Sequence, residues 1–139
     1  MKISKPPDPD HSLSKLDYMT DRLPPLSDFI ATKLGRTVEY AMDSGVCFGI
    51  GALNQDDVAV QKSFISQGAK FPHHDHKEVE ILAVFKGEIQ VSTNSCDKTL
   101  GVGDVIKISP EEEHSVNALS DAWIIGITIP RSEGYPAVP

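Results

Sequence analysis

The stretch FPHHDHKEVEILAVFKG, residues 71–87, decides the fold because it joins a cluster of imidazole and charged side chains directly to an apolar run. Three of the chain's five histidines, His73, His74 and His76, fall within four positions of this stretch. The run ILAVF at residues 81–85 must be buried, because exposing so many apolar side chains to water is unfavourable. Histidines placed directly before a buried run indicate a site inside the fold.

The spacing of these residues indicates that several of them share one face. Residues two apart in a β-strand point the same way, so His74 and His76 lie on one face. Glu80 rejoins that face after a turn or along the next strand. His114 opens a later strand that, in a closed sheet, lies beside the first and brings another imidazole to the same interior. We expect these four side chains to converge, with His73 exposed on the opposite face.

Three neutral imidazoles and one carboxylate form a donor set that suits a divalent transition metal. Mixed nitrogen and oxygen ligands favour Fe²⁺, Mn²⁺, Ni²⁺, Cu²⁺ or Zn²⁺, whereas Ca²⁺ and Mg²⁺ prefer more oxygen. Four protein ligands on a six-coordinate ion leave two positions for water, a bidentate substrate or dioxygen, whereas a tetrahedral Zn²⁺ would be nearly closed. We therefore expect one such ion per chain, whose identity decides the reactivity.

Short strands separated by turn residues dominate the sequence after residue 57. Lys86 and Gly87 separate two of these runs and predict a tight hairpin turn. The pattern is typical of an antiparallel all-β sandwich or barrel. The expected strands cover residues 58–66, 78–85, 88–94, 104–108, 114–119 and 122–129.

Alternation along the strand that contains Glu80 predicts an apolar outer face. If Glu80, Leu82 and Val84 face the interior, the apolar residues between them face outward, where polar residues would be expected. The other sheet, an N-terminal helix or a second subunit must cover that face, and we expect a homodimer. In the last strand, the alternating residues expected to belong to the core are Trp123, Ile125, Ile127 and Ile129.

The first part of the chain has a different character. Residues 1–12 hold three prolines and little to bury, which favours a flexible tail. The sequence LPPLSDFIATKLG, residues 23–35, predicts a short amphipathic helix with Ser27 as its N-cap and Gly35 as its C-terminal stop. Alternation within residues 46–50 indicates one strand. The expected divisions are a tail at 1–12, a helix and extended segment packed on the barrel at 13–56, the barrel at 57–130, and a C-terminal tail at 131–139.

Composition limits the classes of function. A chain of 139 residues is long enough for one domain, and its net charge of −7 comes with scattered lysines and arginines. Such a charge distribution does not attract nucleic acid or anionic lipid, so we expect neither as a partner. No stretch approaches the roughly 18 consecutive apolar residues of a membrane span. The two cysteines are far apart in sequence, which favours a reducing, cytoplasmic location.

The histidine-rich stretch resembles the first sequence motif of the cupin family. The family pattern G-x5-H-x-H-x3-E-x6-G is matched with every gap correct by Gly68, His74, His76, Glu80 and Gly87. The second motif, G-x5-P-x-G-x2-H-x3-N, is matched in part. Gly103 and His114 hold their positions, whereas its Pro, Gly and Asn positions are occupied by Ser109, Glu111 and Ala118.

This resemblance covers roughly residues 57–130 and implies a double-stranded β-helix, or jelly roll, in a small single-domain protein. It implies that the metal lies inside the barrel and is held by the residues matching His74, His76, Glu80 and His114. The departures in the second motif affect the loop before His114 and hence access of a small-molecule ligand or substrate.

Three interpretations of function follow. In the first, the protein is a metal-binding enzyme acting on a small molecule, such as an oxygenase. In the second, it is a non-catalytic module that binds or senses a small ligand. In the third, it is a metal-free structural cupin. Nothing beside the motif stands out as a general base, so the reaction and the catalytic residues are not predicted.

Overall fold

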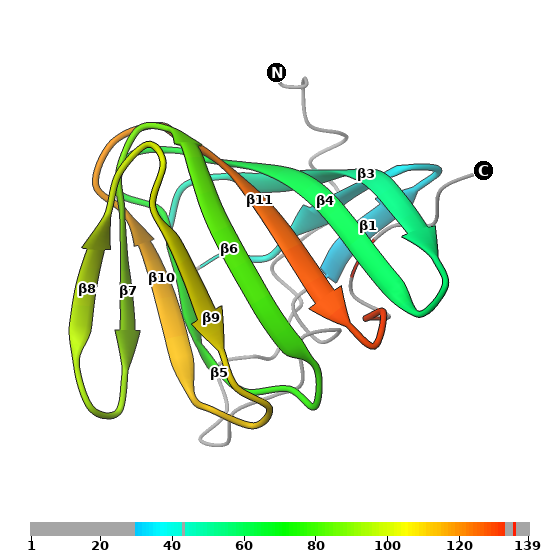
Figure 1. Ribbon diagram of the computed structural model, residues 1–139. Helices are drawn as coiled ribbons and strands as arrows, with labels where there is room; N and C mark the ends of the chain where they lie inside the picture. The colour runs from blue at the N-terminus through cyan, green and yellow to red at the C-terminus, as the bar shows by residue number, and fades with distance from the viewer. Residues whose placement is uncertain (1–29, 43, 133–134, 136–139) are drawn as a thin grey trace.

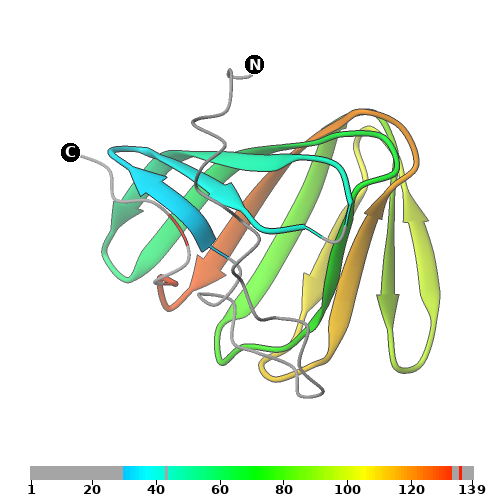
Figure 2. The same cartoon turned by 180° about the vertical axis from the view of Figure 1, so that it is seen from behind.

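The computed structural model describes residues 30–42, 44–132 and 135, which form strands and turns and contain no helix. Two antiparallel sheets face each other in a jelly roll, and Figures 1 and 2 show the larger and the smaller sheet as its two layers. Because the described part of the chain has no helix, it contains no helix that could span a membrane. The strands are β1 (Ile30–Leu34), β2 (Thr37–Tyr40), β3 (Cys47–Gln55), β4 (Val58–Ile65), β5 (Lys70–His74), β6 (Val79–Lys86), β7 (Ile89–Thr93), β8 (Asp97–Leu100), β9 (Val105–Ile108), β10 (His114–Ala118) and β11 (Ala122–Ile129).

The two sheets divide the chain unequally. The larger has the order β1-β2-β3-β4-β11-β6-β9, and the smaller has the order β5-β10-β7-β8. Strands distant in sequence are therefore neighbours, as β4 and β11 are along their whole length. The expected all-β jelly roll is confirmed, and so is each of the six strands expected after residue 57, with ends shifted by at most one residue.

The helix expected at residues 23–35 is wrong where the structure describes it. Residues Ile30–Leu34 form strand β1, which pairs with β2 across a turn in which Gly35 has a φ of 60°. Gly35 was expected to end a helix, and its left-handed conformation instead serves a hairpin turn. Ser27 and the rest of that segment lie outside the described residues, as does the expected tail at 1–12. Strands β1 to β3 extend the larger sheet.

The turn at Gly87 also differs from expectation. The strands on either side do not pair as a hairpin, because β6 belongs to the larger sheet and β7 to the smaller. Gly87 has a φ of 79°, and a Cβ at this position would lie 2.2 Å from the carbonyl oxygen of Asp121. The close approach of two chain segments at the crossing between sheets therefore requires glycine.

Alternation along β6 is confirmed, because Glu80, Leu82 and Val84 are buried inside the barrel and Phe85 is exposed. The same alternation in β11 was interpreted the wrong way round. Its inward residues are Ala122, Ile124, Gly126 and Thr128, and its outward residues are Trp123, Ile125, Ile127 and Ile129. The apolar residues expected in the core instead form part of the outer face of the larger sheet.

An aromatic cluster covers one end of that outer face. Phe48 on β3, Phe64 on β4 and Trp123 on β11 lie side by side in register, with ring centroids 5.4–5.8 Å apart. Phe85 on β6 extends the row with its ring 6.1 Å from that of Trp123. These contacts bury Phe48 to 5% exposure but leave Phe85 45% exposed.

Candidate metal centre

Three histidines from different parts of the chain converge inside the barrel. His74 is the last residue of β5, His76 lies just beyond it, and His114 is the first residue of β10. His74 and His114 are directly paired across β5 and β10. All three are buried, and one ring nitrogen of each lies within 4.8 Å of the others. The expected convergence is confirmed, although His76 shares the face of His74 from a loop and not from the same strand.

Each histidine is oriented by a backbone carbonyl on its outer side. The Nδ1 atoms lie 2.7–3.0 Å from carbonyl oxygens of Pro72, Glu78 and Glu112, for His74, His76 and His114 respectively. A carbonyl oxygen only accepts hydrogen bonds, so each Nδ1 carries the proton and donates it. In a neutral ring this leaves Nε2 as a lone pair directed into the site. Metal-binding histidines are typically oriented by such an outer hydrogen bond.

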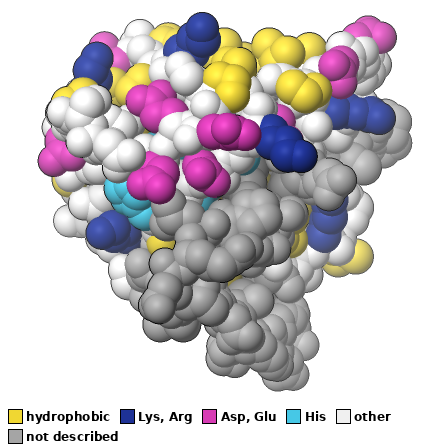
Figure 3. Space-filling view, turned by 90° about the horizontal axis from the view of Figure 1, so that it is seen from below, with side chains coloured by type: hydrophobic (Ala, Val, Ile, Leu, Met, Phe, Trp, Pro, Cys, Tyr) yellow, Lys and Arg dark blue, Asp and Glu magenta, His cyan; other side chains and the backbone are white. Residues whose placement is uncertain are grey.

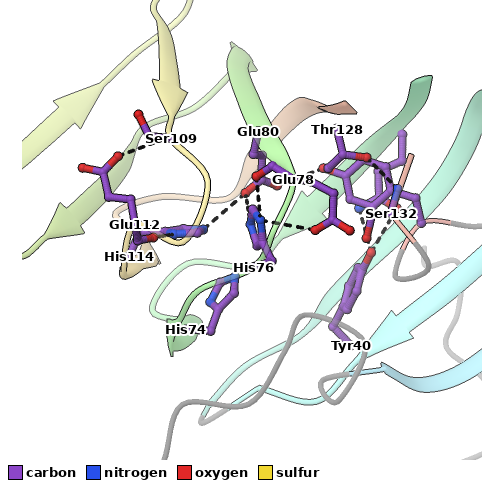
Figure 4. Close-up of polar contacts among 12 residues, drawn as sticks. Tyr40, His74, His76, Glu78, Glu80, Ser109, Glu112, His114, Thr128 and Ser132 are labelled. Carbon is purple, nitrogen blue, oxygen red and sulfur yellow. Dashed lines mark hydrogen bonds and ion pairs between the residues drawn. The ribbon is translucent and has the colours of Figure 1, made fainter. Parts of the chain in front are cut away.

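The Glu80 carboxylate faces two of these nitrogens (Figure 4). Its Oε1 atom lies 3.1 Å from Nε2 of His76 and 3.2 Å from Nε2 of His114. Nε2 of His114 is buried and makes no hydrogen bond of acceptable geometry, despite the short distance. Neutral imidazole lone pairs and a carboxylate repel one another at this distance, so the arrangement requires protons or a cation between them.

The spacing of the donor atoms fits a metal ion. Adjacent ligands of an octahedral ion with bonds of about 2.1 Å are about 3.0 Å apart. The two contacts of Glu80, at 3.1 and 3.2 Å, are close to that separation. The three-histidine group alone could hold a metal, and Glu80 is positioned beside it.

Protonation of the site follows from burial and from the contacts with Glu80. Burial, assisted by the neighbouring His114, lowers the pKa of His74 to about 3. Burial alone would raise the pKa of Glu80, but its contacts with His114 and His76 outweigh burial and hold that pKa well below its usual range. Burial likewise opposes the charge on His76, but Glu80 outweighs it and raises the His76 pKa. His74 is therefore neutral and Glu80 ionised at neutral pH.

The acidic loop before His114, residues 111–113, positions the site through its backbone. The carbonyl of Glu112 accepts the Nδ1 proton of His114, and the amide of Glu111 donates to the carbonyl of His76. Glu111 adopts a φ of 63°, at the position where the family pattern has glycine. The loop retains that backbone conformation and links two of the histidines without glycine.

Tyr135 is a site residue that sequence analysis missed. It lies in the segment expected to be a C-terminal tail, yet it is 4% exposed and its hydroxyl donates to Oε2 of Glu80 at 2.9 Å. A Cβ at Gly126 on β11 would lie 2.3 Å from this hydroxyl, so the glycine makes room for the phenol. The distance of 55 residues between Tyr135 and Glu80 explains why no local pattern indicated the contact.

A cavity adjoins the histidines inside the barrel. Its empty space, counted together with the adjoining open solvent, is about 480 Å³. His74, Glu80 and His114 form part of its wall, and Tyr135 lies beside them. The apolar part of the wall consists of Ile65, Phe71, Leu82, Val116 and Ile124, and the remaining residues are Tyr40, Cys47, Gln61, Ser63 and Gly126. A small molecule in this cavity would lie against the candidate metal ligands.

Comparison with known proteins agrees with this fold. Residues 63–127 match the family model described as the cupin domain. No match was found among curated protein sequences.

Several solved structures are similar in fold. A RmlC-like cupin from Shewanella frigidimarina has a TM-score of 0.61 and 21% identity, covering 66% of this chain and 82% of that one. KdgF from a Halomonas species has a TM-score of 0.60 and 21% identity, covering 63% and 82%. A predicted oxalate decarboxylase from Thermotoga maritima has a TM-score of 0.59 and 21% identity, covering 63% and 84%.

Proposed function

Because the chain is a small cupin-type protein whose cupin domain covers residues 63–127, we propose that it binds one divalent transition-metal ion through the three converging histidines and Glu80. The observation that carries this proposal is the orientation of the imidazoles. Three outer carbonyls hold the Nδ1 protons, so that the Nε2 lone pairs point toward one another and toward a carboxylate. A divalent cation satisfies such a set of acceptors while all three rings are neutral.

We further propose that the protein is an enzyme acting on a small molecule, in the manner of an oxygenase. A transition metal in this site would supply Lewis-acid or redox chemistry to a ligand bound through oxygen. The chain's own part is to hold the ligand in the apolar cavity beside the histidines and to exclude bulk water from it. Tyr135 holds Glu80 in place through its hydrogen bond.

Elemental analysis of the purified, untagged protein tests the metal site. The protein should carry close to one equivalent of Fe, Mn, Ni, Cu or Zn, and His76→Ala should lose most of it. His73→Ala is the matched control, because it removes a neighbouring histidine that is not part of the converging group. Absence of metal in every variant, even after reconstitution with each ion, would show that the ligand assignment is wrong.

Turnover by the loaded protein separates an enzyme from a binding module. An oxygenase should consume dioxygen or alter a candidate substrate at a rate that His76→Ala abolishes. A binding or sensory module should instead show only a higher melting temperature in the presence of its ligand. Ligand stabilisation without turnover would contradict the catalytic proposal and leave the metal proposal standing.

We also propose that the protein is a cytoplasmic homodimer. The outer face of the larger sheet exposes large apolar side chains, among them Phe85 at 45% and Ile129 at 44%. A second copy pairing through that face would cover them. The two cysteines, Cys47 and Cys96, are unpaired in the structure, which suits a reducing compartment.

A further inference from the structure

A polar cluster in the cavity wall is separate from the metal-ligand set. Gln61 and Ser63 lie on β4, and Tyr40 ends β2. The Nε2 group of Gln61 donates to the Tyr40 hydroxyl at 2.8 Å and to the Ser63 hydroxyl at 2.9 Å. All three residues are 4% exposed and line the cavity. Burying an amide in a mostly apolar wall is unfavourable unless its hydrogen bonds are made, so the cluster requires an explanation.

The backbone makes room for this cluster. A Cβ at Gly49 on the neighbouring strand β3 would lie 2.5 Å from Oε1 of Gln61 and 2.7 Å from its Cδ. Only glycine at that position allows the amide to occupy its present place. The position of the cluster therefore depends on the space above Gly49 as well as on its hydrogen bonds.

The hydrogen bonds of this cluster leave one hydroxyl group of the cavity wall available as a donor. Both amide protons of Gln61 are used, by Tyr40 and by Ser63. Ser63 accepts one of them, and none of the described residues accepts the proton of its own hydroxyl. Because Ser63 lines the cavity and its hydroxyl oxygen already accepts a hydrogen bond, its hydroxyl proton can be donated to a ligand.

Charge in and around the cavity favours an uncharged ligand. Among the described lining residues, Glu80 is the one acidic side chain and none is lysine or arginine. Acidic residues gather beside the histidines on the face seen in Figure 3. Asp75, Glu78 and residues 111–113 adjoin the metal ligands in sequence. An anionic group buried in the cavity far from the metal would find no lysine or arginine among the described lining residues to neutralise it.

We propose that Ser63, oriented by Gln61, selects ligands by donating a hydrogen bond to an uncharged oxygen on the end of the molecule away from the metal. The inference rests on the proposed metal site. The ligand class is a small, uncharged molecule with oxygen donors for the metal at one end, an apolar middle, and a hydroxyl or carbonyl oxygen at the other end. The apolar part of the cavity wall contacts the middle.

Hydroxamates provide a test that does not depend on turnover, because they bind transition metals through two oxygens. Calorimetry would compare three series on the cobalt-loaded protein, each two to four carbons long: alkyl, ω-hydroxyalkyl and ω-carboxyalkyl hydroxamates. At the chain length that spans the cavity, the hydroxyl compound should bind about tenfold more tightly than the alkyl compound. The carboxylate compound should bind more weakly than both.

Ser63→Ala should remove the preference for the hydroxyl compound and leave the affinity for the alkyl compound unchanged. Ser115→Ala is the matched control, because Ser115 is equally buried, at 5%, but does not line the cavity. Should Ser63→Ala fail to fold, Gln61→Met, which removes the amide that orients Ser63, must abolish the same preference.

The outcomes separate this inference from the proposed function. Equal binding of hydroxyl and alkyl compounds at every length, or a preference that survives in Ser63→Ala, would overturn the inference while the metal site stands. Tightest binding of the carboxylate compounds would also overturn it. Failure to take up cobalt would overturn the metal site, and the inference with it, and cobalt analysis before titration identifies that case.

Discussion

At the scale of single residues, Glu80 is held by two kinds of contact. One oxygen faces the histidines, while the other accepts a hydrogen bond from Tyr135. Tyr135→Phe removes this bond without removing the ring, so Glu80 should be less well oriented and metal affinity should fall roughly tenfold. Competition with a chromophoric chelator measures the affinity. Tyr40→Phe is the control, because Tyr40 bonds to Gln61 in the same cavity. Equal affinities for the two variants would argue against the positioning role.

Burial of His74 predicts how the stability of the metal-free protein depends on pH. The pKa of His74 is lowered to about 3, by burial first and by His114 second, whereas an unfolded histidine titrates near 6.5. The unfolded chain therefore binds a proton that the folded protein refuses as pH falls from about 6.5 toward 3. Stability decreases over that window by up to about 1.4 kcal/mol per pH unit from this residue.

Urea unfolding of wild type and His74→Asn in the presence of a chelator, at pH 7, 6 and 5, isolates this contribution. The stability of the variant relative to wild type should improve steadily as pH falls. A difference that is constant from pH 7 to pH 5 would show that His74 does not remain neutral in the folded protein.

At the scale of elements, strand β11 depends on a glycine where the Tyr135 side chain lies against it. Gly126→Ala places a methyl group 2.3 Å from the Tyr135 hydroxyl, so the variant should lose about 1–3 kcal/mol of unfolding free energy through overpacking. Gly101→Ala is the control, since the nearest atom to its added Cβ is 4.0 Å away. Denaturant melts of the two variants measure the difference. Equal stability of both variants would mean that Tyr135 moves aside without cost.

Element prediction succeeded where apolar side chains marked a strand and failed where they were few or their spacing was ambiguous. Strands β4, β6 and β11 have eight residues each with a clear period of two. Strands β5 and β8 have five and four residues and few apolar side chains, so no period was visible. The segment that forms β1 was expected to be helical because a few apolar residues in and before it occur at helical spacing. The strand itself is too short to show a period of two.

Periodicity also cannot tell which face of a strand is inside. In β11 the larger apolar residues face outward, and the inward positions include Gly126 and Thr128. The interior must leave room for Tyr135 and the cavity, so small residues are required there. Size alone therefore indicated the wrong face.

At the scale of the whole molecule, the convergence of the candidate metal ligands could be predicted, because the motif spacing along the chain reflects the pairing of two strands. His74 and His114 are 40 residues apart in sequence, but both occupy motif positions and pair directly. Tyr135 and the Ser63–Gln61 pair belong to no motif. Their roles depend on glycines on other strands, Gly126 and Gly49, and become visible only when the sheets are assembled.

The outer face of the larger sheet leads to the last prediction. Phe85 and Ile129 are nearly half exposed on β6 and β11, next to half-buried Ile81 and Ile127. A face of this kind is unfavourable in water but becomes stabilising when a second copy covers it, because the apolar area is removed from solvent. Light scattering after size exclusion should therefore return about twice the chain mass of 15.1 kDa.

Phe85→Glu should convert the dimer to monomer, because it places a charge within the paired apolar faces. Val102→Glu is the matched control: Val102 is 68% exposed in the turn between β8 and β9 and is not part of any strand of the larger sheet. The control should leave the dimer intact. A mass near that of one chain for the wild type across a wide concentration range would exclude the homodimer. Dissociation by both variants alike would show that the outer face is not the interface.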